Sequence, residues 1–288
     1  MANKKLKAPV NIPVEKIHPF EGHPYKVLDN DEMNNLIDSI QQKGVISPIV
    51  VRPLENTTDE YEVISGHRRL RASVKAGLET VPALIYAVSR DEAAIMLVDS
   101  NLHREHILPS ERAFAYKLKM EAMSRQGYRS DLTSCQVGTK LRTDEIIAEN
   151  STDSARQIQR YIRLTNLIPE ILDLVDEERI AFTPAVELSY LNEVEQADLV
   201  EEIRVCDATP NLSQAQRLRA ISREEGLTPE HIGEILAEEK ANQREKIRIP
   251  AERIRKYFPK SYTTEQIEEA IIKICESRYR ARQGRDAR

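Results

Sequence analysis

The chain has 288 residues, of which 31% are charged and 5% aromatic, with no tryptophan and a net charge of −5. This length allows about two domains with hydrophobic cores. The negative charge excludes a general polycation, so any nucleic-acid binding must come from local basic patches. Three distant cysteines, Cys135, Cys206 and Cys275, argue against a disulfide framework or zinc site and favour the reducing cytoplasm. The sequence shows neither a signal peptide nor a run of about 18 apolar residues, so no membrane partner is expected.

The first part, residues 1–108, has the pattern of a small mixed α/β domain. A helix is predicted over 31–43, because Met33, Leu36, Ile37 and Ile40 share one face and Gly44 follows as a stop signal. Short β-branched and aromatic runs predict strands over 48–52, 61–64 and 81–86. A further helix is predicted over 91–99.

An arginine-rich corner follows the strand 61–64. Ser65 and Gly66 lead into a predicted helix whose first turn carries Arg68, Arg69 and Arg71. The first turn of a helix already has unpaired N–H groups and a partial positive charge, so cations there need a compensating anion. Glycine lets the backbone approach an anion, and the arginine fork matches phosphate oxygens. The corner therefore predicts phosphate binding, with a solvated basic face as the alternative.

A second polar stretch ends the helix predicted over 91–99. Asn101 and Arg104 are three residues apart, so one turn would place them on the same side. An ordinary polar helix end is the alternative. Together, the arginine-rich corner and this stretch indicate one pocket, in which the corner forms one wall and this stretch forms the other.

From residue 109 onward the pattern is helical, so the fold class is α+β. A helical domain is predicted over 109–205, with helices over 110–126, 168–175, 184–191 and two short helices within 142–164. Residues 206–248, interrupted by Pro210, Gly226, Pro229 and Gly233, are predicted to be a linker with weak helices. A helical carboxy-terminal segment is predicted over 249–288.

The two short helices within 142–164 predict a helix-turn-helix. Thr143 is the expected N-cap of the first helix, and 151–153 is the turn that caps the second. In the second helix, Ala155, Ile158 and Ile162 form the expected buried stripe. A different stripe is formed by Arg156, Arg160 and Arg163, with Ser154, Gln157 and Gln159 nearby. Arginine and glutamine are the side chains that pair with guanine and adenine edges. The alternative is a helical hairpin with a solvated basic face, and Thr152 stands where this motif often has glycine.

The carboxy-terminal segment carries a narrow stripe formed by Ile267, Ile271 and Ile274. Such a stripe suits a helix paired with another helix, so the segment predicts a homodimer contact. Packing against nearby apolar residues of the same segment is the alternative. The arginines from Arg278 to Arg288 predict either contact with the DNA backbone or a solvated end.

Residues 12–202 resemble the ParB family of DNA partition proteins. The segment 66–72 matches the family's G-x-R-R-x-x-A phosphate motif, and 43–52 matches the segment that lines its cytidine side. The stretch 100–104, followed by 108–113, is similar to the E-N-x-x-R motif and the helix after it. The three motifs occur in the family's order.

The resemblance implies a CTP-gated clamp that partitions a chromosome, plasmid or mobile element. It implies three partners: double-stranded DNA with a short palindromic site, a ParA-type ATPase and a second copy of the chain. It also implies a cytoplasmic protein that is associated with the nucleoid. It implies magnesium at Asn101. The nucleotide-binding residues implied are Gly44, Ser47, Pro48, Ser65, Gly66, His67, Arg68, Arg69, Asn101 and Arg104. The DNA-reading residues implied are Ser154, Arg156, Gln157, Gln159, Arg160 and Arg163.

Two positions depart from the family pattern. His67 and Ser100 stand where the family commonly has glutamate, and neither side chain replaces a hard-oxygen magnesium ligand well. Activity is therefore expected to be a slow CTPase at most, and no catalytic residue is assigned. The related sulfiredoxins carry a reactive cysteine where Gly66 stands, so their sulfur chemistry is not expected. Two rival functions remain open: a helix-turn-helix transcriptional regulator without nucleotide switching, and a ParB-like nuclease.

Overall fold

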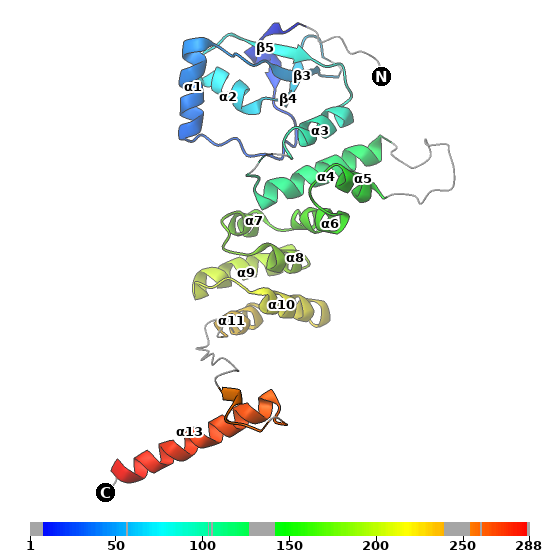
Figure 1. Cartoon of the computed structure of the whole chain (residues 1–288). Helices are drawn as coiled ribbons and strands as arrows, with labels where there is room; N and C mark the ends of the chain where they lie inside the picture. The colour runs from blue at the N-terminus through cyan, green and yellow to red at the C-terminus, as the bar shows by residue number, and fades with distance from the viewer. Residues whose placement is uncertain are drawn as a thin grey trace. The chain divides into compact units, whose positions relative to one another are not determined.

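The computed structural model describes residues 8–55, 57–102, 104, 106–126, 142–238, 254–259 and 261–286. The chain divides into two compact units, Met1–Glu238 and Glu239–Arg288, and each is described by itself (Figure 1). Within the described ranges, none of the helices combines the length and apolar character that a bilayer span requires.

A five-stranded mixed sheet forms the centre of the amino-terminal part. Its strands are β1 Val10–Pro13, β2 Ile17–His18, β3 Ile49–Pro53, β4 Tyr61–Ser65 and β5 Thr80–Ile85, in the spatial order β1-β5-β3-β4-β2. The β1–β5 and β3–β4 pairs are antiparallel, whereas β3–β5 and β2–β4 are parallel. The three strands predicted from the sequence are confirmed to within one residue at each end. The short β1 and β2 were not predicted.

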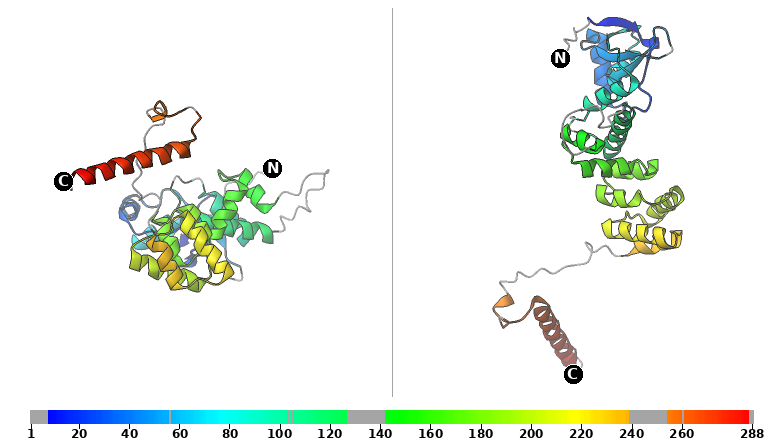
Figure 2. Two further views of the ribbon diagram at one scale, coloured as in Figure 1. Left: turned by 90° about the horizontal axis from the view of Figure 1, so that it is seen from below. Right: turned by 90° about the vertical axis from the view of Figure 1, so that its right-hand side faces the viewer.

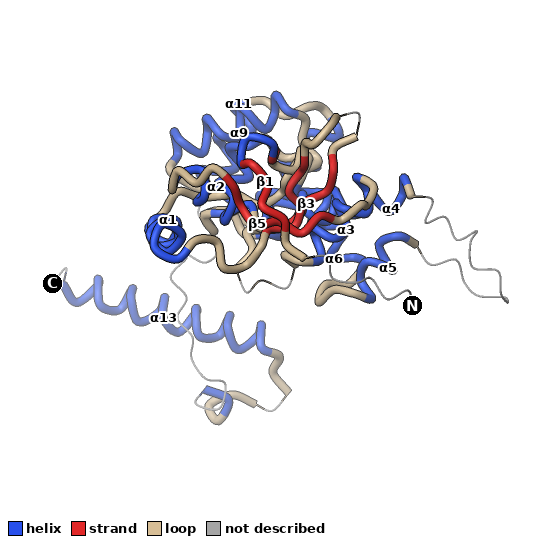
Figure 3. Tube along the Cα trace, turned by 90° about the horizontal axis from the view of Figure 1, so that it is seen from above, coloured by secondary structure: helices blue, strands red, loops and turns tan. Residues whose placement is uncertain are grey.

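The sheet lies between helices that cover its two faces (Figure 3). The helices of this part are α1 Asp31–Lys43, α2 His67–Lys75 and α3 Arg90–Asp99. Because side chains alternate along a strand, Ile49 and Val51 of β3 pack with Leu70 of α2. Val50, between them, packs against the core of α3 instead. Helix α1 packs on α2, with Met33 fully buried between them.

Local capping signals set the ends of these helices. The Asn30 side chain accepts a hydrogen bond from the Met33 backbone N–H, and Gly44 ends α1 with φ +68°. Ser89 and Glu92 form a reciprocal capping box at the start of α3. Such caps satisfy N–H groups that have no partner within the helix. The predicted helix over 31–43 is confirmed, and the one over 91–99 begins one residue earlier.

The rest of the first unit is helical. Its helices are α4 Pro109–Arg125, α5 Thr143–Glu149, α6 Ala155–Leu164, α7 Pro169–Asp176, α8 Phe182–Leu188, α9 Glu193–Cys206, α10 Leu212–Glu224 and α11 Pro229–Ala237. These helices are stacked in layers, in which α4 packs on α6 and α7, α8 on α10, and α9 on α11 (Figure 2). One hydrophobic core, which includes Leu164, Leu199, Leu218 and Ile232, joins α6 to α11. The predicted α+β class is confirmed.

The region 206–248 was predicted to be a linker with weak helices. Its described part does contain helices, but they pack in the core and do not form a linker. Helices α10 and α11 bury Leu218 and Ile232 completely in the same core as α9. Two of the residues interpreted as breakers set helix ends instead: Pro229 is the first residue of α11, and Gly226, with φ +86°, follows the end of α10. Gly233 lies inside α11 and does not interrupt it. Proline suits the first helical position because its missing N–H would be unpaired there anyway. Residues 239–248 lie outside the described residues.

The second unit contains α13, Thr264–Asp286. On the predicted isoleucine stripe, Ile267 and Ile271 are half-buried and Ile274 is exposed. The ring of Phe258 lies 6.3 Å from that of Tyr262. Dimerisation through this stripe therefore stays a prediction. The side chains of the arginine tail beyond Arg278 lie outside the described residues.

Candidate functional site

The corner between β4 and α2 needs a glycine at position 66. Gly66 is the N-cap of α2 with φ +103°, a conformation that side chains of L-residues rarely adopt. A Cβ atom there would lie 2.8 Å from Cγ2 of Ile49 and 3.2 Å from Nη2 of Arg69. The chain therefore turns into α2 with its backbone pressed against β3, and the first turn of the helix faces a cavity.

Acidic residues from α1 and the segment before it compensate two of the three corner arginines. Arg68 pairs with Glu32 at 3.0 Å. Arg71 donates two hydrogen bonds to Asp29, and Lys75 lies 2.8 Å from the same carboxylate. The hydrogen bonds from Arg71 and Lys75 hold the pKa of Asp29 well below its usual range. The carboxylates of Glu32 and Asp29 thus supply part of the negative charge that the arginines at the start of α2 were expected to need.

Arg69 connects the corner to the segment between α1 and β3. Its Nη1 donates to the backbone carbonyls of Ser47 at 2.6 Å and Pro48 at 2.7 Å. Burial lowers the pKa of the guanidinium. The described lining of the cavity does not include Gly44, Ser47 or Pro48. The hydrogen bonds of Arg69 therefore connect the cavity wall to this segment.

The second polar stretch lies at the end of α3. Asn101 is buried, and its Nδ2 donates to the carbonyl of Leu97 at 2.7 Å. This bond leaves the amide oxygen as the end that can meet a ligand. Ser100 donates to the same carbonyl. Asp99 instead pairs with Lys119 of α4 at 2.5 Å.

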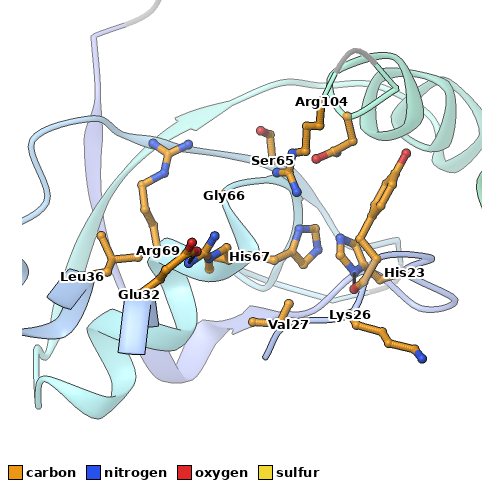
Figure 4. A pocket seen from close by; sticks show the side chains of 13 residues that line it. His23, Lys26, Val27, Glu32, Leu36, Ser65, Gly66, His67, Arg69 and Arg104 are labelled. Carbon is orange, nitrogen blue, oxygen red and sulfur yellow. Dashed lines mark hydrogen bonds and ion pairs between the residues drawn. The ribbon is translucent and has the colours of Figure 1, made fainter. Parts of the chain in front are cut away.

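The two polar stretches line one cavity of about 430 Å³ (Figure 4). Seven of the predicted nucleotide-binding residues line it: Ser65, Gly66, His67, Arg68, Arg69, Asn101 and Arg104. Cavities of roughly 300–1,000 Å³ are typical of small-molecule sites. The structure therefore brings together the two corners that the sequence placed on separate helices.

One wall of the cavity was missed by the sequence analysis. It comes from residues 19–30, which join β2 to α1 and are called the strap here, and it contributes His23, Tyr25, Lys26 and Val27. Helix α1 adds Glu32 and Leu36. The strap has no helix or strand periodicity, so only its position beside α2 reveals its role.

The strap also contacts the helical part of the chain. Lys26 Nζ lies 3.1 Å from Asp176 and 3.2 Å from Asp173 of α7, and its backbone N–H donates to Glu111 of α4. Asp176 also accepts hydrogen bonds from the backbone and hydroxyl of Ser110. Burial opposes the charged form of Lys26, but the hydrogen bonds that its ammonium donates to both carboxylates outweigh burial and raise the pKa of Lys26 overall. The same segment thus contacts the cavity and two helices of the helical part.

Metal-binding groups are sparse at the cavity. The part of the chain that the structure describes has no group of three or more His, Cys, Asp or Glu side chains arranged to hold a metal. Glu32 is the carboxylate among the described lining residues, and Arg68 pairs with it. The oxygen of Asn101 fits a hard cation such as magnesium, but one amide oxygen would leave most ligands to the nucleotide and water.

Helices α5 and α6 form the predicted pair of short helices around a tight turn. The caps differ from the prediction: Arg142, not Thr143, is the N-cap of α5, and Ser154, not 151–153, caps α6 by accepting from the Gln157 N–H. Asp153 in the turn accepts a 2.6 Å hydrogen bond from Tyr116 of α4. This bond to α4 holds the turn that carries Thr152.

The buried stripe of α6 was predicted only in part. Ile158 is fully buried, whereas Ala155 and Ile162 are half-buried. Leu164, which the prediction omitted, is fully buried because α7 to α9 pack against the end of α6.

The six predicted DNA-reading residues differ in exposure. Ser154, Arg156 and Gln159 are exposed, whereas Gln157, Arg160 and Arg163 are half-buried. Gln159 donates to the buried carboxylate of Asp144 at 2.9 Å. The exposed face of α6 therefore carries Arg156 and Gln159, and the hydrogen bond to Asp144 of α5 orients Gln159.

Two arginines of α6 stack on aromatic rings. Arg160 donates to the Thr183 hydroxyl at 3.0 Å, and its guanidinium lies 4.9 Å from the ring of Phe182. Arg163 lies 3.7 Å from the ring of Tyr190. Stacking of this kind holds a guanidinium in place without removing its charge. Sequence periodicity did not predict these contacts, because Phe182 begins α8 and Tyr190 follows the end of that helix.

Comparison with known proteins finds one family model and several similar proteins. The ParB N-terminal domain family model matches residues 2–102. A nucleoid occlusion protein of Listeria innocua is 32% identical over 195 residues, which cover 67% of this chain and 62% of the relative. The chromosome-partitioning protein Spo0J of Thermus thermophilus is 30% identical over 171 residues, covering 59% of this chain and 56% of the relative. The chain thus spans about three fifths of the length of these relatives.

Two solved structures of the truncated ParB protein of Caulobacter crescentus are also similar. The complex with the centromeric parS site is 22% identical, with a TM-score of 0.42 over 73% of this chain and 98% of that chain. The complex with CTP-γ-S is 25% identical, with a TM-score of 0.32 over 69% of this chain and 99% of that chain. On the family-model match, residues 2–102 of this chain belong to the ParB N-terminal domain family.

Proposed function

We propose that this chain is a sequence-specific DNA-binding partition protein that works as a CTP-gated clamp. The observation that carries the proposal is the convergence of the Gly66 corner with Asn101 and Arg104 on one cavity. A cavity lined by three arginines and a helix N-terminus suits a polyanionic ligand. The resemblance to ParB implies that this ligand is CTP.

In this proposal, different residues bind different parts of the nucleotide. The N–H groups at the start of α2 and the guanidinium groups of Arg68 and Arg104 hold the phosphates. Arg69 positions the segment from Gly44 to Pro48, on the base side, through its bonds to two carbonyls. Asn101 offers its oxygen to a magnesium ion, which would neutralise phosphate charge when bound.

The helix-turn-helix supplies DNA recognition in this proposal. Gln159, oriented by Asp144, and Arg160, oriented by Phe182, read base edges, and exposed Arg156 contacts phosphate. Two copies of the chain bind a palindromic site, CTP closes their amino-terminal domains around the DNA, and a ParA-type ATPase acts on the complex. Hydrolysis is at most a slow reset, because neither His67 nor Ser100 provides a carboxylate.

Calorimetric titration with CTP, UTP and ATP tests the nucleotide part. We expect saturable binding of CTP, weaker binding of the other two, and a loss of at least tenfold in affinity in Arg104→Ala. Arg179→Ala, an arginine of the helical part outside the cavity, is the control. Absence of saturable heat with all three nucleotides, with DNA binding intact, would favour the rival helix-turn-helix regulator.

Crosslinking tests the clamp. In a variant with the native cysteines replaced by serine, single cysteines are placed at Leu28, Ile46 and Val74, which are 58%, 80% and 55% exposed in the amino-terminal part. At least one should crosslink between protomers faster with CTP and cognate DNA than without. Val194→Cys, 71% exposed on α9, is the control. Crosslinking rates that ignore CTP at every position would contradict the clamp.

The rival nuclease function is tested with supercoiled DNA and Mg²⁺ or Mn²⁺. The clamp predicts no nicking. Nicking that survives Arg68→Ala would instead favour the nuclease and remove the phosphate role from this corner.

A further inference from the structure

Two histidines stack on each other at the wall of the cavity. His67 begins α2, and His23 belongs to the strap, with ring centroids 3.7 Å apart and ring planes tilted by 37° (Figure 4). His23 Nδ1 lies 2.8 Å from the carbonyl oxygen of Tyr25, so this nitrogen donates its proton there. Nε2 of His67 is buried and, among the described atoms, has no hydrogen-bond partner. A buried imidazole nitrogen without a partner at a cavity wall is a site that a ligand can complete.

The surroundings of this pair are mainly cationic. The charged and titratable groups that line the cavity around it come from the strap, from α1, from α2 and from the stretch after α3: Tyr25, Lys26, Glu32, Arg68, Arg69 and Arg104. The negative group, Glu32, is already paired with Arg68. Burial, then the charges of His23 and Arg104, lower the pKa of His67 to about 3. Burial also lowers the pKa of His23, against the opposing bond to Tyr25. Both rings are therefore neutral near pH 7 in the ligand-free protein.

We propose that the His23–His67 pair contacts the phosphates of the bound nucleotide and takes up one proton as the nucleotide binds. This inference rests on the proposed function and deepens it. A triphosphate in the cavity would place negative charge beside the rings, opposite in sign to Arg104, which together with burial keeps them neutral. One proton is taken up rather than two, because two imidazolium rings 3.7 Å apart would repel each other.

The proposal gives a physical reason why this chain can have His67 where the family commonly has glutamate. A glutamate would bring a fixed negative charge to the phosphates and would need a metal ion between them. A histidine pair offers a hydrogen-bond donor and, once protonated, a positive charge. The pair would therefore supply part of the charge neutralisation that a carboxylate-bound metal otherwise gives.

The proposal fixes the sign of the pH dependence. Between the pKa of the free pair and its raised value in the complex, binding takes up a proton, so affinity increases as the pH falls. A full proton corresponds to about a tenfold gain in affinity per pH unit. A site that binds with the pair neutral throughout would lack this contribution.

Isothermal titration calorimetry in two buffers of low and high ionisation enthalpy measures the proton uptake directly. CTP is titrated into the full-length protein at pH 6.5 in EDTA, and wild type is compared with His67→Gln. Glutamine keeps a polar group that does not titrate, and the ionisation of CTP itself contributes equally to both proteins. We expect wild type to take up more protons per bound CTP than His67→Gln, by about half a proton or more. Equal proton uptake in the two proteins would overturn the proposal.

A second variant tests whether the two histidines share the proton, and a second ligand tests the histidine pair if CTP does not bind. His23→Gln removes the stacking partner and should also reduce proton uptake relative to wild type, and unchanged uptake would contradict a shared proton.

If wild type shows no saturable heat with CTP, the proposed function fails, and inorganic tripolyphosphate replaces CTP in the same experiment. Binding of tripolyphosphate with greater proton uptake in wild type than in His67→Gln would support the pair, and its absence would overturn it. Circular dichroism melts confirm that each variant is folded.

Discussion

The arginines of α2 and those of α6 are both part of basic helices, but their surroundings differ. At α2, Arg68 is paired with a carboxylate and Arg69 with two carbonyls, and both line a cavity. At α6, Arg160 and Arg163 stack on neutral aromatic rings, and Arg156 is exposed. Carboxylate pairing reduces net charge, whereas aromatic stacking fixes direction and leaves the charge in place.

This difference indicates two kinds of anion. A cavity whose charges are already partly compensated can select a small ligand by shape and by a few directed bonds. A helix face with uncompensated, pre-oriented guanidinium groups suits an extended polyanion, where phosphate contacts give affinity and base contacts give specificity. The four predictions below test whether the two regions act as separately as their contacts suggest.

The largest expected effect is on the geometry of the α2 corner. Gly66→Ala should lower the free energy of unfolding by about 3 kcal/mol, because it combines an unfavourable φ with a 2.8 Å contact to Ile49. Gly77→Ala is the matched control, since Gly77 also has a positive φ but has open space within 4 Å of the position that a Cβ atom would take; it should cost about 1 kcal/mol. Urea denaturation measures both. Equal losses would mean that close packing at the corner contributes nothing.

The next effect separates the two regions by ligand. Arg160→Ala should weaken binding to the palindromic site that wild type selects from a random duplex pool by about 2 kcal/mol, or roughly 30-fold. It should leave the affinity for CTP unchanged. Arg104→Ala should do the reverse for binding measured with each ligand alone. Fluorescence anisotropy and calorimetry give the two affinities, and a loss of both affinities in either variant would show that the regions are not separate.

The third effect is the pH dependence of stability at the cavity. His67 has a pKa of about 3 in the folded chain and 6.5 as its ordinary value, so below pH 6.5 the unfolded state binds more protons. Stability should therefore fall as the pH falls, by about 2 kcal/mol from this residue between pH 7 and pH 5. Wild type and His67→Gln are compared by urea denaturation at both values. Parallel losses in the two proteins would show that His67 is not held neutral.

The smallest effect concerns exposed Arg156. Arg156→Gln should weaken DNA binding almost equally for specific and random duplexes. It should also reduce the slope of log affinity against log salt concentration by about 1, because one phosphate contact is lost. Lys117→Gln on α4 serves as a control for a general change in charge. A change confined to the specific duplex would reassign Arg156 to base reading.

Much of the local structure was predictable from the sequence. The limits of α1 and of the three central strands follow from short-range patterns of apolar residues and caps. The presence of the short helices α5 and α6 follows from the same patterns, although their caps are Arg142 and Ser154 and not the predicted residues. The glycine–arginine corner was recognisable because a strand, a glycine and a helix start are consecutive in the chain. The α10 and α11 helices were misjudged because Pro229 and Gly226, which mark helix ends, resemble breaks when no packing partner is visible.

The sequence by itself determined which residues form the corner at Gly66, the second stretch at Asn101 and the face of α6, because each depends on neighbours within a few positions. Only the tertiary structure decided that the first two share a cavity, that His23 stacks on His67, and that Arg69 holds the segment at Ser47 and Pro48. These contacts join residues 21 to 44 positions apart, and no helix or strand period relates residues at such separations. They form because the sheet, α1 and α2 pack together and carry the attached loops with them.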